Sequence, residues 1–207
     1  MKRRFGDKPR GTGSRKRKPV MFLSLEGNNK TEKLYLQSLN KDLGEKYTLV
    51  FSSSRVTDLP NMWAALHDLM SGSFSSEDGD KAYCLCDRDY EPHKLEHIKE
   101  IKQDVRRSQA RLIVSNPCFE IWFLNHFRYS TKSYPPGREL MGDLCSFVPC
   151  YEKNRDYYSM HLKSKTLDAI RNSIHQIEQV GGDGPPDGFI PKNPGTEVYE
   201  IVQAIHA

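Results

Sequence analysis

Short apolar runs alternate with amphipathic stretches along the first part of this 207-residue chain. Four of these runs predict β-strands, because near-continuous apolarity over a few residues is typical of strands buried on both faces of a parallel sheet. The strands are expected at residues 20–26, 47–53, 81–87 and 110–115. Apolar residues at helical spacing and helix-start signals follow each run. They predict helices at about residues 30–43, 58–70, 93–107 and 117–127.

A helix after every strand implies crossover connections between parallel strands. The predicted fold class is therefore α/β, with an open, mainly parallel, Rossmann-like sheet and flanking helices. We expect this α/β core to occupy residues 20–127.

The pattern changes past residue 127. Tyr, Pro and Gly become frequent and no period is sustained over residues 128–157. The remaining elements are predicted as a helix at 159–178, a loop at 181–195 and a short helix from about 196. Residues 128–207 are thus expected to form a C-terminal helical extension packed on the core.

Composition favours a soluble, cytoplasmic protein. Hydrophobic residues make up 37% and charged residues 28% of the chain. No window approaches the roughly 18 apolar residues that a membrane-spanning helix needs. The first residues are basic but lack the apolar segment of a secretory signal, so no export is expected. The five cysteines are an odd number without metal-site spacing, which predicts reduced thiols in the core.

The net charge of +4 is unevenly distributed. Residues 1–18 carry nine Lys or Arg and one Asp, whereas the rest of the chain carries 22 basic and 26 acidic residues. We therefore predict a disordered basic tail over residues 1–19. Such a tail either contacts nucleic-acid phosphates without sequence preference or serves only as a solubilising arm.

Two of the predicted strands end in acidic residues. Glu26 ends the first strand, and Asp87 and Asp89 come at the end of the third. Because ligands of open α/β sheets bind at the carboxyl ends of the strands, these three side chains are expected to meet at one site. If the backbone stays extended, Asp87 and Asp89 point the same way and Arg88 points away.

Clustered carboxylates repel one another and are costly to desolvate without a counter-charge, so such a cluster typically marks a divalent cation. Hard oxygen ligands suit Mg²⁺ or Mn²⁺. Each motif by itself is also common in turns. It is the combination of Glu26 with Asp87 and Asp89 on adjacent strand ends that predicts a metal site.

Several motifs together resemble the RloB-like family of proteins. They are Glu26-Gly27, Thr31-Glu32, Tyr35, Asp87-Arg88-Asp89, SNPCFEIWFLNHF at 115–127, YEKN at 151–154 and NPGTEVYEIV at 193–202. The resemblance covers most of residues 20–207 and implies a Toprim-type fold. It further implies metal-dependent phosphodiester chemistry at Glu26, Asp87 and Asp89. It also implies a role in bacterial anti-phage defence beside an ABC-type or AAA-type ATPase, for which residues 128–207 are the expected docking surface.

Two further residues are candidates for the active site. Glu120 lies in the first turn of an otherwise apolar helix, where a structural role is the alternative. Lys153 of the YEKN motif is a candidate contact to a scissile phosphate, although a loop lysine is more often simply solvated. Thr31 and Glu32 either cap the first helix or support the site. His126 is expected at the edge of the core rather than in catalysis.

The sequence favours a hydrolase, in which a water attacks the phosphodiester and Glu26 binds metal or acts as general acid or base. The chain has no room for the separate domain that would bring a topoisomerase its nucleophilic tyrosine. DNA, tRNA or another RNA remain open as substrates, as does assembly into an oligomer. The competing hypothesis is a catalytically silent, metal-binding subunit that docks an ATPase or nucleic acid. A nucleotide-binding domain is disfavoured because the first strand–helix turn lacks the G-x-G-x-x-G and P-loop spacings.

Overall fold

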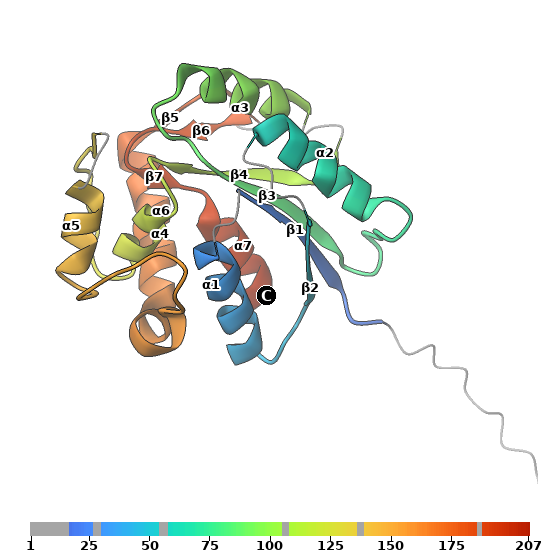
Figure 1. Cartoon of the computed structure of the whole chain (residues 1–207), viewed down its shortest axis with the longest axis horizontal. Coiled ribbons are helices and arrows are strands. Elements are labelled where there is room, and N and C mark those ends of the chain that lie inside the picture. Colours follow the sequence, from blue (N-terminus) through green and yellow to red (C-terminus); the bar gives the residue numbers. More distant parts are fainter. Residues whose placement is uncertain (1–16, 27–29, 54–57, 105–107, 136–138, 186–187) are drawn as a thin grey trace, which may run out of the picture.

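The computed structural model describes residues 17–26, 30–53, 58–104, 108–135, 139–185 and 188–207. A five-stranded sheet of order β2-β1-β3-β4-β7 forms its centre (Figure 1). Four strands are parallel, namely β1 (Val20–Leu25), β2 (Thr48–Phe51), β3 (Lys81–Asp87) and β4 (Arg111–Asn116), and β7 (Gly195–Thr196) is antiparallel to β4. The predicted open, mainly parallel α/β sheet is confirmed.

Alternation along the strands divides the core into two layers. Met21, Leu23 and Leu25 of β1 face one hydrophobic cluster, whereas Phe22 faces the other. Helices α2 (Leu59–Met70) and α3 (Pro92–Asp104) cover the second face. The first face is covered by α1 (Thr31–Asp42), α4 (Glu120–Asn125), α6 (Thr166–Val180) and α7 (Val198–His206) (Figure 1). Apolar area is thus removed from water on both sides of the sheet, as its near-continuous apolar strands require.

The cysteine prediction is only partly right. Cys84 and Cys86 alternate along β3 and are buried together in the second layer, and all five cysteines are free. Cys145 and Cys150, however, are exposed, and Cys118 is partly exposed. The expectation that all five are core thiols fails because the latter three lie outside the strands.

The helix predicted over residues 117–127 is shorter than expected. It begins at Glu120, and the N–H of the preceding Phe119 donates to the Asp87 carboxylate at 2.8 Å. At the other end, His126 donates its N–H to the Phe123 carbonyl three residues back, so the helix closes in a tighter turn.

Past residue 127 the structure departs most from the sequence pattern. Helix α5 (Glu139–Cys145) was not predicted, and the expected helix start at residue 159 is occupied by a π-helical turn, Tyr158–Leu162, before α6. The predicted loop at 181–195 holds two two-residue strands, β5 (Gly182–Asp183) and β6 (Ile190–Pro191), and a third, β7, spans the end of the loop and Thr196, where the last helix was expected to begin. Strands this short show no alternation from which they could be predicted. Gly195 is required in β7, because a Cβ there would lie 2.7 Å from the Lys192 carbonyl.

The two predicted parts of the chain, residues 20–127 and 128–207, share one hydrophobic cluster. Tyr158, Ile170 and Val202 from the second part pack in the same cluster as Met21 and Tyr35 from the first. Strand β7 also completes the edge of the main sheet. Residues 128–207 therefore belong to the same packed unit as the main sheet.

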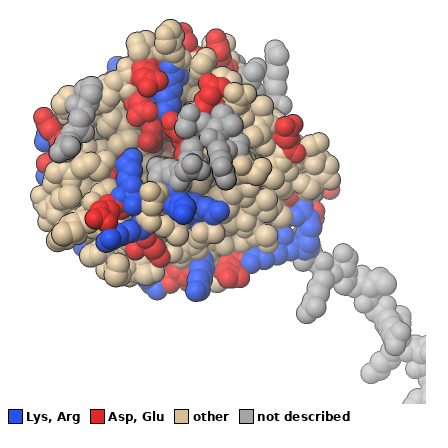
Figure 2. All heavy atoms as spheres, viewed as in Figure 1, with Lys and Arg blue, Asp and Glu red and all other residues tan. Residues whose placement is uncertain are grey.

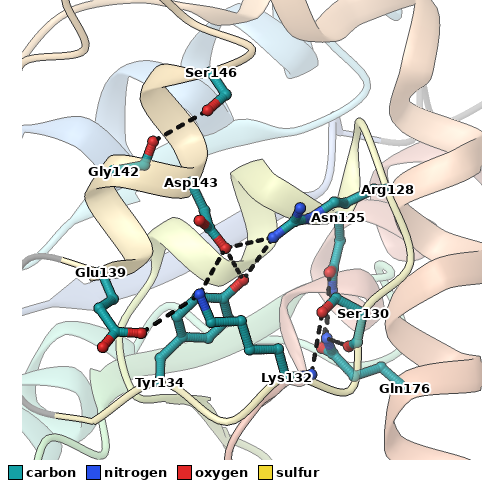
Figure 3. A network of polar contacts seen from close by, with 10 residues as sticks. All are labelled: Asn125, Arg128, Ser130, Lys132, Tyr134, Glu139, Gly142, Asp143, Ser146 and Gln176. Carbon is teal, nitrogen blue, oxygen red and sulfur yellow. Dashed lines mark hydrogen bonds and ion pairs between the residues drawn. The ribbon is translucent and has the colours of Figure 1, made fainter.

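A compact polar network anchors α5 to the chain before it (Figure 3). Asp143 of α5 accepts hydrogen bonds from the hydroxyl of Tyr134 at 2.9 Å and from Lys132 at 3.2 Å, and it also pairs with Arg128. Lys132 forms a further ion pair with Glu139 at 3.4 Å. We call these five residues the α5 cluster. Its carboxylates and cations are equal in number.

Most of the predicted basic tail lies outside the described residues. Of its last three residues, Arg17 donates to Asp78 at 2.8 Å and to the buried side chain of Asp80 at 2.6 Å. In the described part of the chain, no helix combines the length and apolar character needed to cross a membrane.

Candidate metal and active site at the sheet edge

The strand order of the sheet indicates where a ligand would bind, at the carboxyl ends of β1 and β3. Strands β2 and β3 lie on opposite sides of β1, so the strand order reverses between β1 and β3. In open α/β sheets, ligands bind outside the carboxyl ends of the strands at such a reversal. Leu25 of β1 and Leu85 of β3 are paired in register, which brings Glu26 and Asp87 to this point from neighbouring strands.

Glu26 and Asp89 converge on a lysine of α3. The Lys94 ammonium lies 2.7 and 2.8 Å from the two carboxylate oxygens of Glu26 and 2.6 Å from Oδ2 of Asp89. Lys94 is only 9% exposed. Burial lowers its pKa, but the two carboxylates outweigh burial, so the pKa of Lys94 is raised above its usual value. The predicted convergence of the two strand ends is therefore present, with a protein cation inside it.

Asp87 lies at the centre of the carboxylates. Its backbone N–H donates to Oε2 of Glu26 at 3.2 Å, and its Oδ1 accepts the Phe119 N–H at 2.8 Å. Burial raises the pKa of Asp87 well above its ordinary range, and the charges of four other carboxylates raise it further. These belong to Glu32, Glu120, Glu26 and Asp89. Asp87 thus experiences more negative charge than its local cations compensate.

The position of Asp89 is set by a left-handed turn. It does not follow from the side-chain alternation of an extended strand. Strand β3 ends at Asp87, and Asp89 has a φ of 46°, a conformation that costs energy in a residue other than glycine. The Asp89 N–H is held by the Pro117 carbonyl at 3.0 Å. Arg88 donates from its guanidinium to the backbone carbonyl of Asp89 at 3.2 Å. The assumption of an extended backbone was wrong, although Asp89 still reaches the site.

Glu120 and Lys153 form an ion pair close to Asp87. Glu120 is 1% exposed, and its Oε1 accepts a hydrogen bond from the Tyr151 hydroxyl at 3.0 Å and faces the Lys153 ammonium at 3.2 Å. Its other oxygen, Oε2, is buried and has no hydrogen-bond partner within the described residues. Burial lowers the pKa of Lys153, but Glu120 and Asp87 outweigh it and the net shift is upward. Both residues are therefore electrostatically coupled to the strand-end carboxylates.

The YEKN loop is tied to the start of α1. The Lys30 N–H donates to the Asn154 side chain at 2.8 Å, and the Asn154 N–H donates to the Thr31 hydroxyl at 2.9 Å. Next to Thr31, Glu32 is 4% exposed. Burial, reinforced by the charge of Glu120, raises the pKa of Glu32 to about 7. These contacts explain how two distant motifs, Thr31-Glu32 and YEKN, reach the same site.

His126 is a core residue, as expected. It is 1% exposed, with one ring nitrogen 3.2 Å from the Tyr35 hydroxyl and the other 2.9 Å from the Trp122 carbonyl. Burial lowers its pKa to about 4, which keeps the ring neutral near pH 7.

A polar cavity of about 330 Å³ opens onto Glu26, Asp89 and Lys94. Its other lining residues are Asp58, Leu59, Glu91, His93 and His97. The cavity gives water access to the strand-end carboxylates.

The carboxylates fit a hard divalent cation by their chemistry and charge. Asp87 and the four carboxylates around it form a group of five, and within the described residues Lys94 and Lys153 are the cations that pair with them. Carboxylate oxygens are the donors that Mg²⁺ and Mn²⁺ prefer. As they stand, however, no three or more His, Cys, Asp or Glu side chains in the described ranges are grouped so that they would hold an ion. Lys94 occupies the space between Glu26 and Asp89, so binding an ion there requires the ammonium to move.

Lys94 is the site residue that sequence reasoning missed. It lies five residues past Asp89 on the polar helix α3, where a lysine looks like an ordinary solvated side chain. The available signal was its place in the first turn of a helix that starts directly after an acidic strand end.

Comparison with known families decides where the chain belongs. A family model described as RloB-like protein matches residues 21–205, nearly the whole chain. The chain belongs to the RloB-like family. No curated protein and no solved structure gives a significant match.

Proposed function

We propose that this protein is a phosphodiester hydrolase, an endonuclease that depends on Mg²⁺ or Mn²⁺ held by Glu26, Asp87 and Asp89. The observation that carries this proposal is the excess of carboxylates at the reversal of strand order between β1 and β3. Carboxylates held this close together in a partly buried site are favourable only if a cation or protons compensate them.

A bound divalent ion supplies a nucleophilic water and stabilises charge on the phosphodiester oxygens. The chain's own residues account for the rest. Glu26, whose side chain is 24% exposed, lies on the cavity, and the alternative to its role as metal ligand is that of general acid or base. Buried Glu120 positions Lys153, which is half-exposed and free to turn its ammonium toward a phosphate oxygen.

The substrate class and partner follow from the family resemblance and remain part of the proposal. We propose DNA, tRNA or another RNA as substrate, and an anti-phage defence role beside an ABC-type or AAA-type ATPase that docks on residues 128–207. Acidic and basic side chains are interspersed on the face shown in Figure 2, so this face lacks the broad basic surface expected of a free nuclease. The basic residues at the N-terminus or the partner would supply that surface.

The test is a cleavage assay on the Glu26→Gln variant with plasmid DNA and with tRNA in Mn²⁺. Because a charged ligand or general base is lost, we expect the cleavage rate to fall by about 10²-fold or more. Glu139→Gln is the matched control, because the same chemical change is made in the α5 cluster at a side chain that is 57% exposed. A folded Glu26→Gln protein that cuts at the parental rate would remove Glu26 from the mechanism.

One observation favours a second candidate function. Three hydrogen bonds from Lys94 already satisfy Glu26 and Asp89, which suits a catalytically silent subunit that binds metal or a partner. The two functions separate in the same assay, run with and without the ATPase. Absence of cleavage in both, with intact Mn²⁺ binding, supports the silent subunit.

A further inference from the structure

Lys94 joins two carboxylates that come from different elements. Glu26 follows β1, whereas Asp89 lies in the turn after β3, and α3 presents the ammonium between them. Its three hydrogen bonds use both oxygens of Glu26 and one oxygen of Asp89. These are the oxygens that a divalent cation bound by Glu26 and Asp89 would need. The ammonium and a metal ion therefore compete for the same acceptors.

Displacing Lys94 requires another place for its charge, because a buried ammonium without a partner is strongly unfavourable. The adjoining cavity of about 330 Å³ offers that place, since Lys94 lines it together with His93 and His97. The two histidines are four residues apart on α3 and so lie on one face of the helix. Four carboxylates line the cavity, Glu26, Asp58, Asp89 and Glu91, so an anion is strongly disfavoured there until a metal ion neutralises two of them, Glu26 and Asp89.

We propose that Lys94 exchanges partners within the catalytic cycle. Without metal, it is the internal counter-ion of Glu26 and Asp89. When a divalent cation takes these oxygens, the ammonium turns into the cavity and binds a phosphate group of the nucleic-acid substrate beside His93 and His97. Lys94 then lowers metal affinity in the free protein and raises substrate affinity in the metal-loaded protein. This inference rests on the proposed function, because it requires that Glu26 and Asp89 bind a divalent ion.

The exchange is tested by replacing Lys94 and measuring two ligands. Lys94→Met keeps the unbranched apolar stem and removes the ammonium, and Lys94→Gln keeps a hydrogen-bond donor should the methionine variant fold poorly. Lys99→Met is the matched control, because Lys99 is an exposed lysine on the same helix that pairs only with the exposed Glu96 at 2.8 Å in the described part of the chain. Calorimetric titration with Mn²⁺ should give about tenfold tighter binding or more for both Lys94 variants, since a competing charge is removed. Lys99→Met should bind as the parent does.

The second ligand is a short fluorescent oligonucleotide with phosphorothioate linkages, which resists cleavage. In saturating Mn²⁺, its affinity measured by anisotropy should fall about tenfold for the Lys94 variants and stay unchanged for Lys99→Met, because one charge-assisted phosphate contact is lost. Opposite changes in the two affinities are the signature of the exchange.

The outcomes separate this inference from the proposed function. A parent that binds Mn²⁺ while the Lys94 variants bind it equally well overturns the competition alone. Tighter Mn²⁺ binding with unchanged oligonucleotide affinity overturns the phosphate assignment. A parent that binds no Mn²⁺ overturns the metal site itself, and the exchange with it.

Discussion

Two clusters of charged side chains in this protein are built on different principles. In the α5 cluster, Asp143 and Glu139 face Arg128 and Lys132, so carboxylates and cations are equal in number. At the sheet edge, five carboxylates share two lysines among the described residues, and the pKa of Asp87 is raised by burial and by its neighbours. We use the name sheet edge for the cluster of Glu26, Glu32, Asp87, Asp89 and Glu120 with Lys94 and Lys153. The backbones of the two clusters differ as well. Among their described non-glycine residues, only Asp89 of the sheet edge has a positive φ.

The difference separates structural from functional charge. A compensated cluster fixes one segment to another and needs nothing else, as the α5 cluster does for residues 128–135 and helix α5. An uncompensated cluster raises the energy of the folded chain unless a ligand or protons arrive. Opposite responses to neutralising substitutions should therefore distinguish the two regions.

The largest expected change in stability is a loss in the α5 cluster. Asp143→Asn removes the charge that Arg128 and Lys132 share and weakens the hydrogen bond from buried Tyr134. We expect a decrease of about 2 kcal/mol in the free energy of unfolding, because hydrogen bonds to charged groups are lost. Urea unfolding with and without Mn²⁺ measures it. The decrease should be independent of metal, and a metal-dependent decrease would contradict the structural role of this cluster.

At the sheet edge, removal of a charge should instead stabilise the metal-free protein. The pKa of Glu32 is raised from 4.5 to about 7, so the folded state favours its protonated form. The stability that protonation contributes is fully present below about pH 4.5 and is lost as the pH rises through about 7. Glu32→Gln resembles the protonated form and should gain about 1 to 2 kcal/mol near pH 8 in EDTA, and far less near pH 5.

Urea unfolding at both pH values checks this, with the exposed Glu139→Gln as control. Equal effects of Glu32→Gln at the two pH values would show that its charge is already compensated, and the contrast between the two clusters would disappear.

The smallest expected effect sharpens the description of the α5 cluster. Lys132 is 45% exposed, whereas Asp143 is mostly buried and Tyr134 is fully buried. Lys132→Met should therefore cost less than about 1 kcal/mol, the usual range for an exposed ion pair. Thermal unfolding at low and high salt measures it. A loss as large as that of Asp143→Asn would mean that Lys132, rather than Arg128 and Tyr134, holds α5 in place.

What the sequence predicts well is what depends on local periodicity. The ends of β1 and β3 were predicted from apolar runs, and the meeting of Glu26 with Asp87 followed from the geometry of parallel strands. Such inferences need only that neighbouring strand ends share an edge. Glu120 and Lys153 were candidates from their positions in a helix and in a loop, and the structure brings them together.

What the sequence did not predict depends on contacts between distant residues. Lys94 became part of the site only because α3 begins beside Glu26, 68 residues earlier in the chain. Helix α5 is short and held by polar contacts, so it lacks the apolar period that marks longer helices. Strand β7 forms because β4 offers a free edge, and two residues carry no period at all.

The most direct test of the account is a calorimetric titration of the metal-free protein with Mn²⁺. We predict binding that is lost in Asp87→Asn/Asp89→Asn and retained in Asp143→Asn, because of the two clusters it is the one around Asp87 that has more carboxylates than cations among the described residues. Binding should also raise the melting temperature of the parent, since a ligand of the folded state stabilises it by mass action. If the double variant binds Mn²⁺ as tightly as the parent, the ion lies elsewhere and the sheet edge is not the metal site.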